Sequence, residues 1–468
     1  MAKRNGGIIG PANTPTSSVA AGVWRLRDAF NSIKNGTWPL TRSVATNSLR
    51  FNRGSSDTLS RTFSTATNYK IQTFSAWIKR ANISGSTTYR LIGGYNGSAS
   101  FSSEINFNND SLRMEFGGSS QYILKTTQLF RDVSAWYHIL VAIDTTQATS
   151  SNRIKMYVNG SQVTAFDTAN YPAQNDNSQL TSANANNYVG SGWSGGEPFD
   201  GYMSDVFFID GQALTPSSFG ASNASGVWYP IPYQGTYGTN GFNLKFANSA
   251  SLGTDSSGNA NNFTVNNLTS VDQSTDIPTN NFATMNPLVA TGGTYTEGNL
   301  QYLTAATDGN WSWSSITPSS GGNWYCEAKM ISSSNGTYQV GITAATNGTP
   351  RILYVSSGAV YLDGSNVATY ATYTTNDIIG MAYNSSTKSL TFYKNGVSQG
   401  SQTASSTNDY YFGSTGQSGG ATHTVAFNFG SPPYSANGYT DAAGYGNFSY
   451  AVPSGYYALC TKNLNTYG

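Results

Sequence analysis

Apolar segments separated by polar loops and turns, as in a succession of strands, are the clearest pattern along the chain. Residues 136–144 form one such segment, and after a short polar loop Ile154, Met156 and Val158 alternate with polar or amphipathic neighbours. The pair Asn159-Gly160 follows directly. Asn-Gly tolerates the positive backbone angles of a tight type I′ turn, so this region is predicted to contain β-hairpins.

The same arrangement occurs again in the second half of the chain. Residues 377–383 and 389–394 are two such segments around a polar loop, and they are followed by Asn395-Gly396. Further strands are expected at residues 71–79, 202–210, 324–331, 338–343, 424–429 and 456–462. Two copies of one hairpin arrangement predict an all-β fold with two antiparallel β-sandwich domains of the jelly-roll type.

The beginning of the chain has a different pattern. Residues 1–17 are small and polar, as in an extended arm, and apolar side chains then recur at spacings of three and four up to Pro39. This spacing predicts one short helix. The helix either packs on the first sandwich of its own chain or docks the protein on an assembly, and the candidate docking residues are Val23, Trp24, Leu26, Phe30, Ile33 and Trp38.

Changes of composition along the chain suggest four segments. We expect an N-terminal arm and helix at 1–43, a first sandwich at 44–220, a structured connector at 221–299 and a second sandwich at 300–468. The connector is rich in Asn, Ser and Gly, but Phe242, Leu244 and Phe246 alternate as they would in a strand.

Charge is scarce in this chain of 468 residues. Charged residues make up 10% of it, and 24 basic against 23 acidic residues give a net charge of +1. A surface that neutralises nucleic-acid phosphates or anionic lipids needs a basic excess, so neither partner is expected. No apolar run approaches the roughly 20 residues of a membrane span. The start lacks the apolar stretch of a signal peptide, so we expect synthesis in the cytosol.

Three motifs in the first half carry a family resemblance. They are Trp-Tyr-His-Ile at 136–139, Tyr-Val-Asn-Gly at 157–160 and the segment from Phe199 to Thr215. In this order they resemble the laminin-G-like, concanavalin A-like jelly roll over residues 44–220. Five ordered segments in the second half, at 323–329, 338–342, 390–396, 425–430 and 455–464, resemble a SPRY-type sandwich.

The pairing of these two domains behind an arm is similar to virion structural proteins of tailed bacteriophages. That resemblance implies a virion location, other virion proteins as partners and no catalytic residues. It leaves two roles open, a tail or surface appendage that binds host glycans, and a decoration or cement protein of the capsid or tail. A low-charge β-surface also favours a homo-oligomer.

Catalysis finds little support in the residues. The concanavalin A-like glucanases that the first half resembles carry a Glu-x-Asp-x-x-Glu pattern. The five glutamates do not form it: Glu104, Glu115, Glu197, Glu297 and Glu327. Glu197 and Asp200 are interpreted as solvated turn residues. A polysaccharide depolymerase is therefore the least favoured alternative.

Other reactive groups are also scarce. The only histidines, His138 and His423, lie in or beside predicted strands and are interpreted as structural. Cys326 and Cys460 fall on predicted strands of one domain, where free buried thiols are favoured over a disulfide. The oxygen-rich run at 255–259 is interpreted as turns rather than a calcium site, so no metal or cofactor is expected.

Surface recognition remains, and flat aromatic faces with neutral hydroxyl and amide groups are suited to sugars. Trp193 and Tyr95 lie in predicted Gly-rich loops and are the candidate glycan-binding residues, although both could instead plug the ends of the first sandwich. Residues 432–450 form either a lip of a binding surface or a packed or intersubunit loop.

Overall fold

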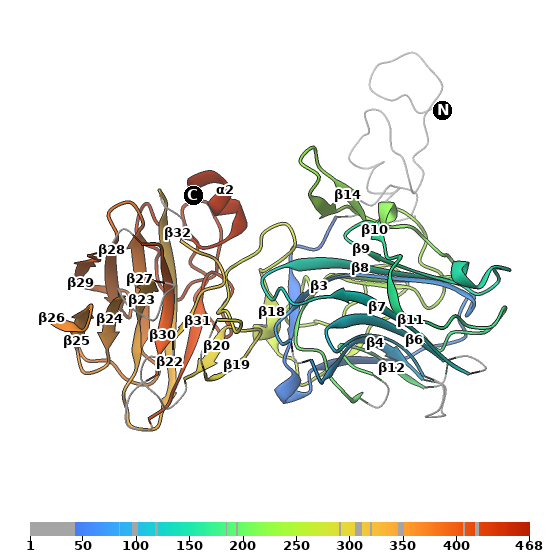
Figure 1. Cartoon of the computed structure of the whole chain (residues 1–468), viewed down its shortest axis with the longest axis horizontal. Coiled ribbons are helices and arrows are strands. Elements are labelled where there is room, and N and C mark those ends of the chain that lie inside the picture. Colours follow the sequence, from blue (N-terminus) through green and yellow to red (C-terminus); the bar gives the residue numbers. More distant parts are fainter. Residues whose placement is uncertain are drawn as a thin grey trace, which may run out of the picture. The chain divides into compact units, whose positions relative to one another are not determined.

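The protein is described here from a computed structural model. It describes residues 43–83, 85–95, 102–117, 120–183, 185–192, 195–289, 292–304, 311–318, 321–344, 351–405, 408–416 and 421–468. Within these ranges the chain folds into antiparallel sheets and one short α-helix (Figure 1). The all-β class is thus confirmed for the described residues. The predicted N-terminal helix and its six docking candidates lie outside them.

The first sandwich consists of two sheets. One has the order β10 (Ser161–Gln162), β9 (Ile154–Val158), β8 (Trp136–Asp144), β3 (Ile71–Arg80), β13 (Gly201–Asp210), β1 (Ser48–Phe51) and β18 (Gln273–Ser274), with β16 (Phe242–Leu244) paired to β13. The other has the order β11 (Phe166–Ala169), β7 (Gln121–Leu129), β6 (Ser111–Gly117), β5 (Ser103–Asn108), β4 (Thr88–Gly94), β12 (Asn186–Val189), β2 (Thr58–Thr62) and β17 (Thr264–Asn266).

The second sandwich also has two sheets. One runs β19 (Thr294–Thr296), β20 (Gln301–Leu303), β31 (His423–Asn428), β22 (Asn323–Ser333), β27 (Ile378–Asn384), β28 (Ser389–Lys394) and β29 (Val397–Thr403), with β32 (Tyr457–Ala458) parallel to β22. The other runs β21 (Trp311–Trp313), β30 (Tyr410–Thr415), β23 (Gln339–Ala344), β24 (Arg351–Val355), β25 (Ala359–Leu362) and β26 (Ser365–Thr369).

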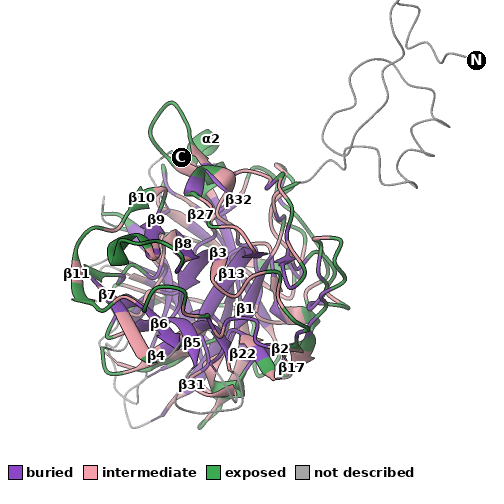
Figure 2. Cartoon of the chain, turned by 90° about the vertical axis from the view of Figure 1, so that its right-hand side faces the viewer, coloured by how far each residue is buried: buried purple, intermediate pink, exposed green. Residues whose placement is uncertain are grey.

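Each sandwich has its own apolar core, built from alternate positions of the facing sheets. Phe74 and Ile139 of one sheet meet Ile105 and Met114 of the other in the first core. Figure 2 shows this buried interior between more exposed strands and loops. Alternation puts every second side chain on the same face of a strand, which is why the pattern located β3, β8, β9 and β13 correctly.

The two predicted Asn-Gly turns are confirmed. Asn159 and Gly160 have φ values of 48° and 82°, and Asn395 and Gly396 have 49° and 81°. Positive φ at both central residues is what a type I′ turn requires. These turns connect β9 to β10 and β28 to β29.

Residues of the expected connector extend both sandwiches. β16 pairs with β13, β17 with β2 and β18 with β1, whereas β19 pairs with β20 of the second sandwich. The division into four segments stays a prediction. Both sandwiches fall within one compact unit that comprises Ala45–Pro216 and Tyr237–Gly468.

Residues Ser217–Thr236 belong to a separate small unit. It contains a two-stranded sheet of β14 (Gly220–Ser222) and β15 (Trp228–Pro230). Phe219 stacks on Tyr233 with ring centroids 5.0 Å apart, which gives this unit a small apolar contact of its own.

The end of the chain differs from the prediction. A strand was expected at residues 456–462, but the strand β32 covers only Tyr457–Ala458, and the helix α2 (Thr461–Tyr467) follows. Asn463 explains the change, since its buried amide donates to Asp441 Oδ2 at 2.7 Å and to the carbonyl of Ala458 at 2.9 Å. This tertiary contact overrides a local pattern that resembles a strand. None of the described helices is long and apolar enough to span a membrane.

Candidate functional site

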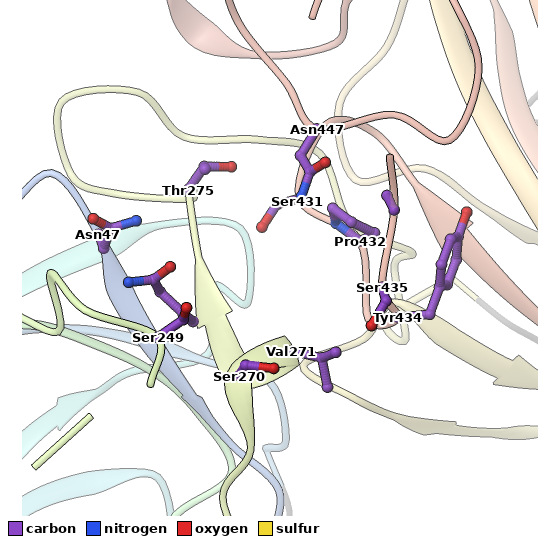
Figure 3. A pocket seen from close by; sticks show the side chains of 12 residues that line it. Asn47, Ser249, Ser270, Val271, Thr275, Ser431, Pro432, Tyr434, Ser435 and Asn447 are labelled. Carbon is purple, nitrogen blue, oxygen red and sulfur yellow. The ribbon is translucent and has the colours of Figure 1, made fainter. Parts of the chain in front are cut away.

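A polar pocket lies where the two sandwiches meet within the large unit (Figure 3). Its volume is about 260 Å³. Nine of its lining residues carry a neutral hydroxyl or amide side chain. The lining consists of Asn47, Ser249, Ser270, Val271, Gln273, Thr275, Ser431, Pro432, Tyr434, Ser435, Ala436 and Asn447.

Two segments far apart in sequence form the walls. On one side β18 pairs with β1, which places the short helix η5 (Ser270–Asp272) and Thr275 beside Asn47. On the other side the chain leaves β31 and turns through residues 431–436. Figure 3 shows Asn47, Ser249 and Thr275 across the pocket from Pro432 and Tyr434.

Direct hydrogen bonds join the two walls. The hydroxyls of Ser274 and Ser431 are 2.6 Å apart, and Thr275 Oγ1 donates to the carbonyl of Gly430 at 3.1 Å. Both Ser274 and Ser431 are buried. Buried hydrogen bonds of this kind fix the relation between their partners, because breaking them would leave polar atoms without water. The pocket is therefore held open by the fold itself.

Arg50 bonds to both sides of the same junction. Its side chain is fully buried, and its guanidinium donates to the carbonyls of Val271 at 2.9 Å and Pro432 at 3.4 Å. It also forms ion pairs with Asp272 at 3.1 Å and Glu297 at 3.2 Å. One rigid cation thus positions the backbone on both sides of the pocket.

Several polar groups in the pocket are available to a ligand. Within the described residues, the hydroxyls of Ser249, Ser270 and Ser435 make no hydrogen bond. The amide of Asn447 is oriented, because its Oδ1 accepts from the backbone nitrogen of Gly438 at 3.1 Å. Tyr434 adds an aromatic ring that packs against the ammonium of Lys329, 5.1 Å from the ring centroid.

The pocket offers hydrogen bonding but no proton transfer. Tyr434 is the one ionisable residue among those that line it, and burial, with the nearby Glu327, raises its pKa well above the ordinary value for tyrosine. It therefore stays neutral at physiological pH. Such a lining suits an uncharged ligand that is rich in hydroxyl groups.

Of the two predicted glycan-binding residues, the structure describes Tyr95, which lies on the first sandwich. Tyr95 follows β4 and is half-buried, whereas Trp193 lies outside the described residues. Tyr95 is not among the residues that line the pocket. The sequence analysis therefore did not predict this pocket, although it named residues 432–450 as one possible lip of a binding surface.

The backbone of Ser191 and Gly192 packs closely against the outer face of β4. A Cβ on Gly93 would lie 2.8 Å from the Cα of Gly192, and a Cβ on Gly192 would lie 2.2 Å from Arg90. Two glycines are thus needed for the backbone of Ser191 and Gly192 to lie on this sheet. The close approach also covers the carboxylate of Glu104.

That face carries a carboxylate pair that the sequence analysis missed. Glu104 on β5 and Glu115 on β6 are directly opposite each other in the sheet. A sequence pattern along one strand does not reveal Glu104 and Glu115 as a pair, because their proximity depends on the pairing of two strands. Opposite residues of an antiparallel pair have Cβ atoms about 4.5–5.5 Å apart, which is compatible with the carboxyl separation of about 5 Å in retaining glycosidases.

Both carboxylates are nevertheless engaged by neighbouring side chains. Glu104 is fully buried and forms an ion pair with Arg90. Glu115 accepts from Asn106 Nδ2 at 3.0 Å and pairs with Arg113 at 3.3 Å. Carboxylates that are paired with arginines suit a structural network better than a general acid, which must hold a proton.

Glu197 and Asp200, the acidic pair from the sequence analysis, lie in different surroundings. Glu197 pairs with Arg90 at 2.5 Å and its side chain is 43% exposed. Asp200 is buried, and desolvation raises its pKa to about 6. The interpretation of both as solvated turn residues is therefore wrong for Asp200, and the partly exposed Glu197 pairs with an arginine.

Each sandwich contains a buried serine–histidine pair. Ser75 Oγ lies 2.8 Å from His138 Nε2, and Ser414 Oγ lies 3.0 Å from His423 Nε2. Both histidines are about 1% exposed. Burial lowers the pKa of His138 to about 3 and that of His423 to about 4. A substrate cannot reach these groups, which agrees with the structural role predicted for the histidines.

The remaining candidates are structural as well. Cys326 and Cys460 are free buried thiols. The carboxylate of Asp255 accepts from Asn243, Ser257 and Asn261, so the run at 255–259 forms turns as predicted. Among the residues that the structure describes, no group of three or more His, Cys, Asp or Glu side chains could hold a metal ion.

A family model matches the first sandwich. Residues 32–219, less than half of the chain, match a laminin G model described as the concanavalin A-like lectin/glucanases superfamily. The expected concanavalin A-like jelly-roll fold of this part is therefore confirmed. A comparison with curated proteins gives no match.

Parts of this chain are similar in fold to solved structures, of which three are described here. The SPRY domain of human HERC1 is 17% identical, with a TM-score of 0.27 over 31% of this chain and 96% of that domain. Domain 4 of the arabinanase AbnA from Geobacillus stearothermophilus, solved with arabinotriose, is 22% identical, with a TM-score of 0.25 over 32% of this chain and 65% of the other.

The third example is a protein from Bacteroides ovatus provisionally assigned as carbohydrate-binding. It is 18% identical, with a TM-score of 0.32 over 49% of this chain and 60% of the other. In the last two cases the match spans less than two thirds of the other protein. With TM-scores this low, these likenesses carry no step of the functional argument.

Proposed function

We propose that the protein binds neutral glycans, without cleaving them, in the pocket between its two sandwiches. The observation that carries this proposal is the lining, in which neutral hydroxyl and amide groups predominate and no acidic or basic side chain occurs. Sugars present hydroxyl groups that both donate and accept hydrogen bonds. A rigid set of Ser, Asn and Gln groups matches this chemistry without the cost of desolvating a charge.

The family match supports the same ligand class. The description of the matching model names lectins and glucanases, and both of these classes of protein recognise sugars. Fold likeness alone does not assign a function, and the pocket therefore has to supply the specific argument.

Absence of catalysis is the second part of the proposal. Glycoside hydrolysis needs one protonated and one ionised carboxyl group on either side of the bond that breaks. No carboxylate lines the pocket, and the opposed pair Glu104 and Glu115 is held by arginines. These features support a binding protein over a depolymerase.

The setting that we propose is a virion, where the protein is a tail or surface appendage that contacts host glycans. Its support is the resemblance of the two-domain arrangement to virion proteins of tailed phages. Many copies on one particle convert weak contacts into firm attachment, because linked binding raises the effective concentration. A decoration or cement role is the alternative, with other virion proteins in place of glycans.

A glycan array tests the binding proposal. The Ser249→Ala, Ser435→Ala double variant removes two hydroxyls that make no hydrogen bond within the described residues, so folding should be unaffected. Each lost ligand bond is worth about 0.5–1.5 kcal/mol, so binding should weaken about 5- to 150-fold. Ser398→Ala on the exposed strand β29 is the matched control.

Two results would count against the proposal. Full-strength binding by the double variant would remove the pocket as the glycan site. New reducing ends after incubation with a bound polysaccharide would show catalysis, and their loss in Glu115→Gln would locate it on the outer face of the first sandwich. Wild-type binding that the double variant loses, with no new reducing ends, is the expected result.

A further inference from the structure

We infer that the pocket recognises a single terminal sugar residue rather than the interior of a polysaccharide chain. This inference rests on the proposed function and specifies which part of a glycan the same site accepts. It follows from the size of the pocket and from the way in which its walls are joined.

Size is the first observation. Pockets for drug-sized ligands have volumes of about 300–1,000 Å³, and this pocket has about 260 Å³. The space therefore suits one sugar ring. A stretch of several sugars would require a groove with a longer lining than these residues provide.

The second observation is that the walls are bonded to each other across the pocket's boundary. Ser431 and Thr275 line the pocket and are also the residues that bridge the sandwiches, through the hydroxyl of Ser274 and the carbonyl of Gly430. A polysaccharide that continued in this direction would have to break these buried bonds. The chain of a bound glycan can therefore extend only away from this boundary.

Arg50 makes widening of the pocket costly. Its ion pairs with Asp272 and Glu297 and its bonds to the carbonyls of Val271 and Pro432 would all be strained if the walls moved apart. Breaking a buried ion pair is strongly unfavourable because a charge then remains without its partner. The pocket should thus keep its present size when ligand binds.

A single sugar ring has few atoms, so its affinity is limited. At the efficiency of about 0.3 kcal/mol per heavy atom typical of ordinary ligands, a ring of about a dozen heavy atoms gives a Kd on the order of millimolar. Attachment then depends on many copies that each bind one chain end, as a surface displaying many chain ends allows.

The experiment uses the full chain and the oligosaccharide with the strongest array signal. Retention of this oligosaccharide is compared with that of the same oligosaccharide extended by one different sugar at its non-reducing end. Competition is measured with methyl glycosides of glucose, galactose, mannose, rhamnose and N-acetylglucosamine. We expect the extension to weaken retention at least tenfold, and the methyl glycoside of the terminal sugar to compete in the millimolar range.

A variant whose pocket is filled by a large side chain tests whether the oligosaccharide binds at this site. Ala436 lines the pocket, so Ala436→Trp should abolish both retention and competition, whereas Ala442→Trp in the same segment is the matched control. Equal retention of the extended oligosaccharide, without competition by any methyl glycoside, would overturn this inference and leave the proposed function standing. Failure of the wild-type protein to retain any neutral oligosaccharide would overturn both.

Discussion

Replacing His138 with glutamine should remove much of the acid sensitivity of the first sandwich. The imidazole is about 1% exposed, its Nε2 lies 2.8 Å from the hydroxyl of Ser75, and its ring lies 5.1 Å from that of Trp77. Burial lowers its pKa from 6.5 to about 3. The folded state therefore excludes a proton that the unfolded chain accepts readily.

The sign and size of the effect follow from linkage. Between the folded and unfolded pKa values the unfolded chain binds more protons, so stability is complete above pH 6.5 and declines as the pH falls toward 3. Each pH unit within this window corresponds to about 1.4 kcal/mol. Wild-type protein should therefore lose about 3 kcal/mol from this group between pH 7 and pH 4. The glutamine amide cannot be protonated in this range and can still bond to Ser75.

Hydrogen exchange read by mass spectrometry measures this locally, in peptides that cover β3 and β8. After correction for intrinsic exchange rates, the stability difference between His138→Gln and wild type should grow by about 3 kcal/mol from pH 7 to pH 4. His423→Gln is the matched control, since it should act on β22 and β31 instead. An identical loss of stability in acid at β3 and β8 in wild type and His138→Gln would show that His138 does not cause the acid sensitivity.

Three further substitutions test other parts of the structure. Arg50→Met leaves the buried carboxylate of Asp272 and the half-buried carboxylate of Glu297 without their cation and should destabilise the protein by about 3–5 kcal/mol in urea unfolding; a change below 1 kcal/mol would contradict its role at the junction. Burial raises the pKa of Asp205 to about 6, so this carboxylate costs stability as the pH rises from 3.8 through 6. Asp205→Asn should therefore gain about 3 kcal/mol relative to wild type between pH 3 and pH 7, and a pH-independent difference would exclude this. Gly93→Val forces its side chain against Gly192 and should speed hydrogen exchange in peptides around residue 192, whereas unchanged exchange would show that the contact is not made.

Local patterns were sufficient for most of the strands. Ile71–Arg80, Trp136–Asp144 and Gly201–Asp210 have, within a residue, the bounds predicted from the sequence. Each is a buried strand whose apolar positions face one core, and the Asn-Gly pairs impose their own backbone angles. These features depend on neighbours in sequence, so they can be predicted without a structure.

Features that depend on distant pairing could not be predicted in this way. Glu104 and Glu115 became neighbours only through the register of β5 and β6. The helix α2 forms where Asn463 reaches Asp441, which lies 22 residues earlier. Neither contact leaves a periodic signal in the chain.

The pocket, too, depends on residues that are far apart in the sequence and could not be predicted from local patterns. Ser274 and Ser431 are 157 residues apart, yet their hydroxyls join the two walls. The excess of neutral polar residues in the composition indicated sugar recognition in general, and Trp193 and Tyr95 stay predictions for a second contact surface. Which of the many Ser and Asn residues converge on one pocket is decided by how the two sandwiches pack.

A crystal structure of the protein soaked with the best oligosaccharide from the array would show directly where the glycan binds. We expect one sugar ring between the sandwiches, within hydrogen-bond distance of Ser249, Ser435 and Asn447, with its chain leading away from Ser431. Density on the outer face of β5 and β6 beside Arg113 and Glu115, with the pocket empty, would contradict this expectation.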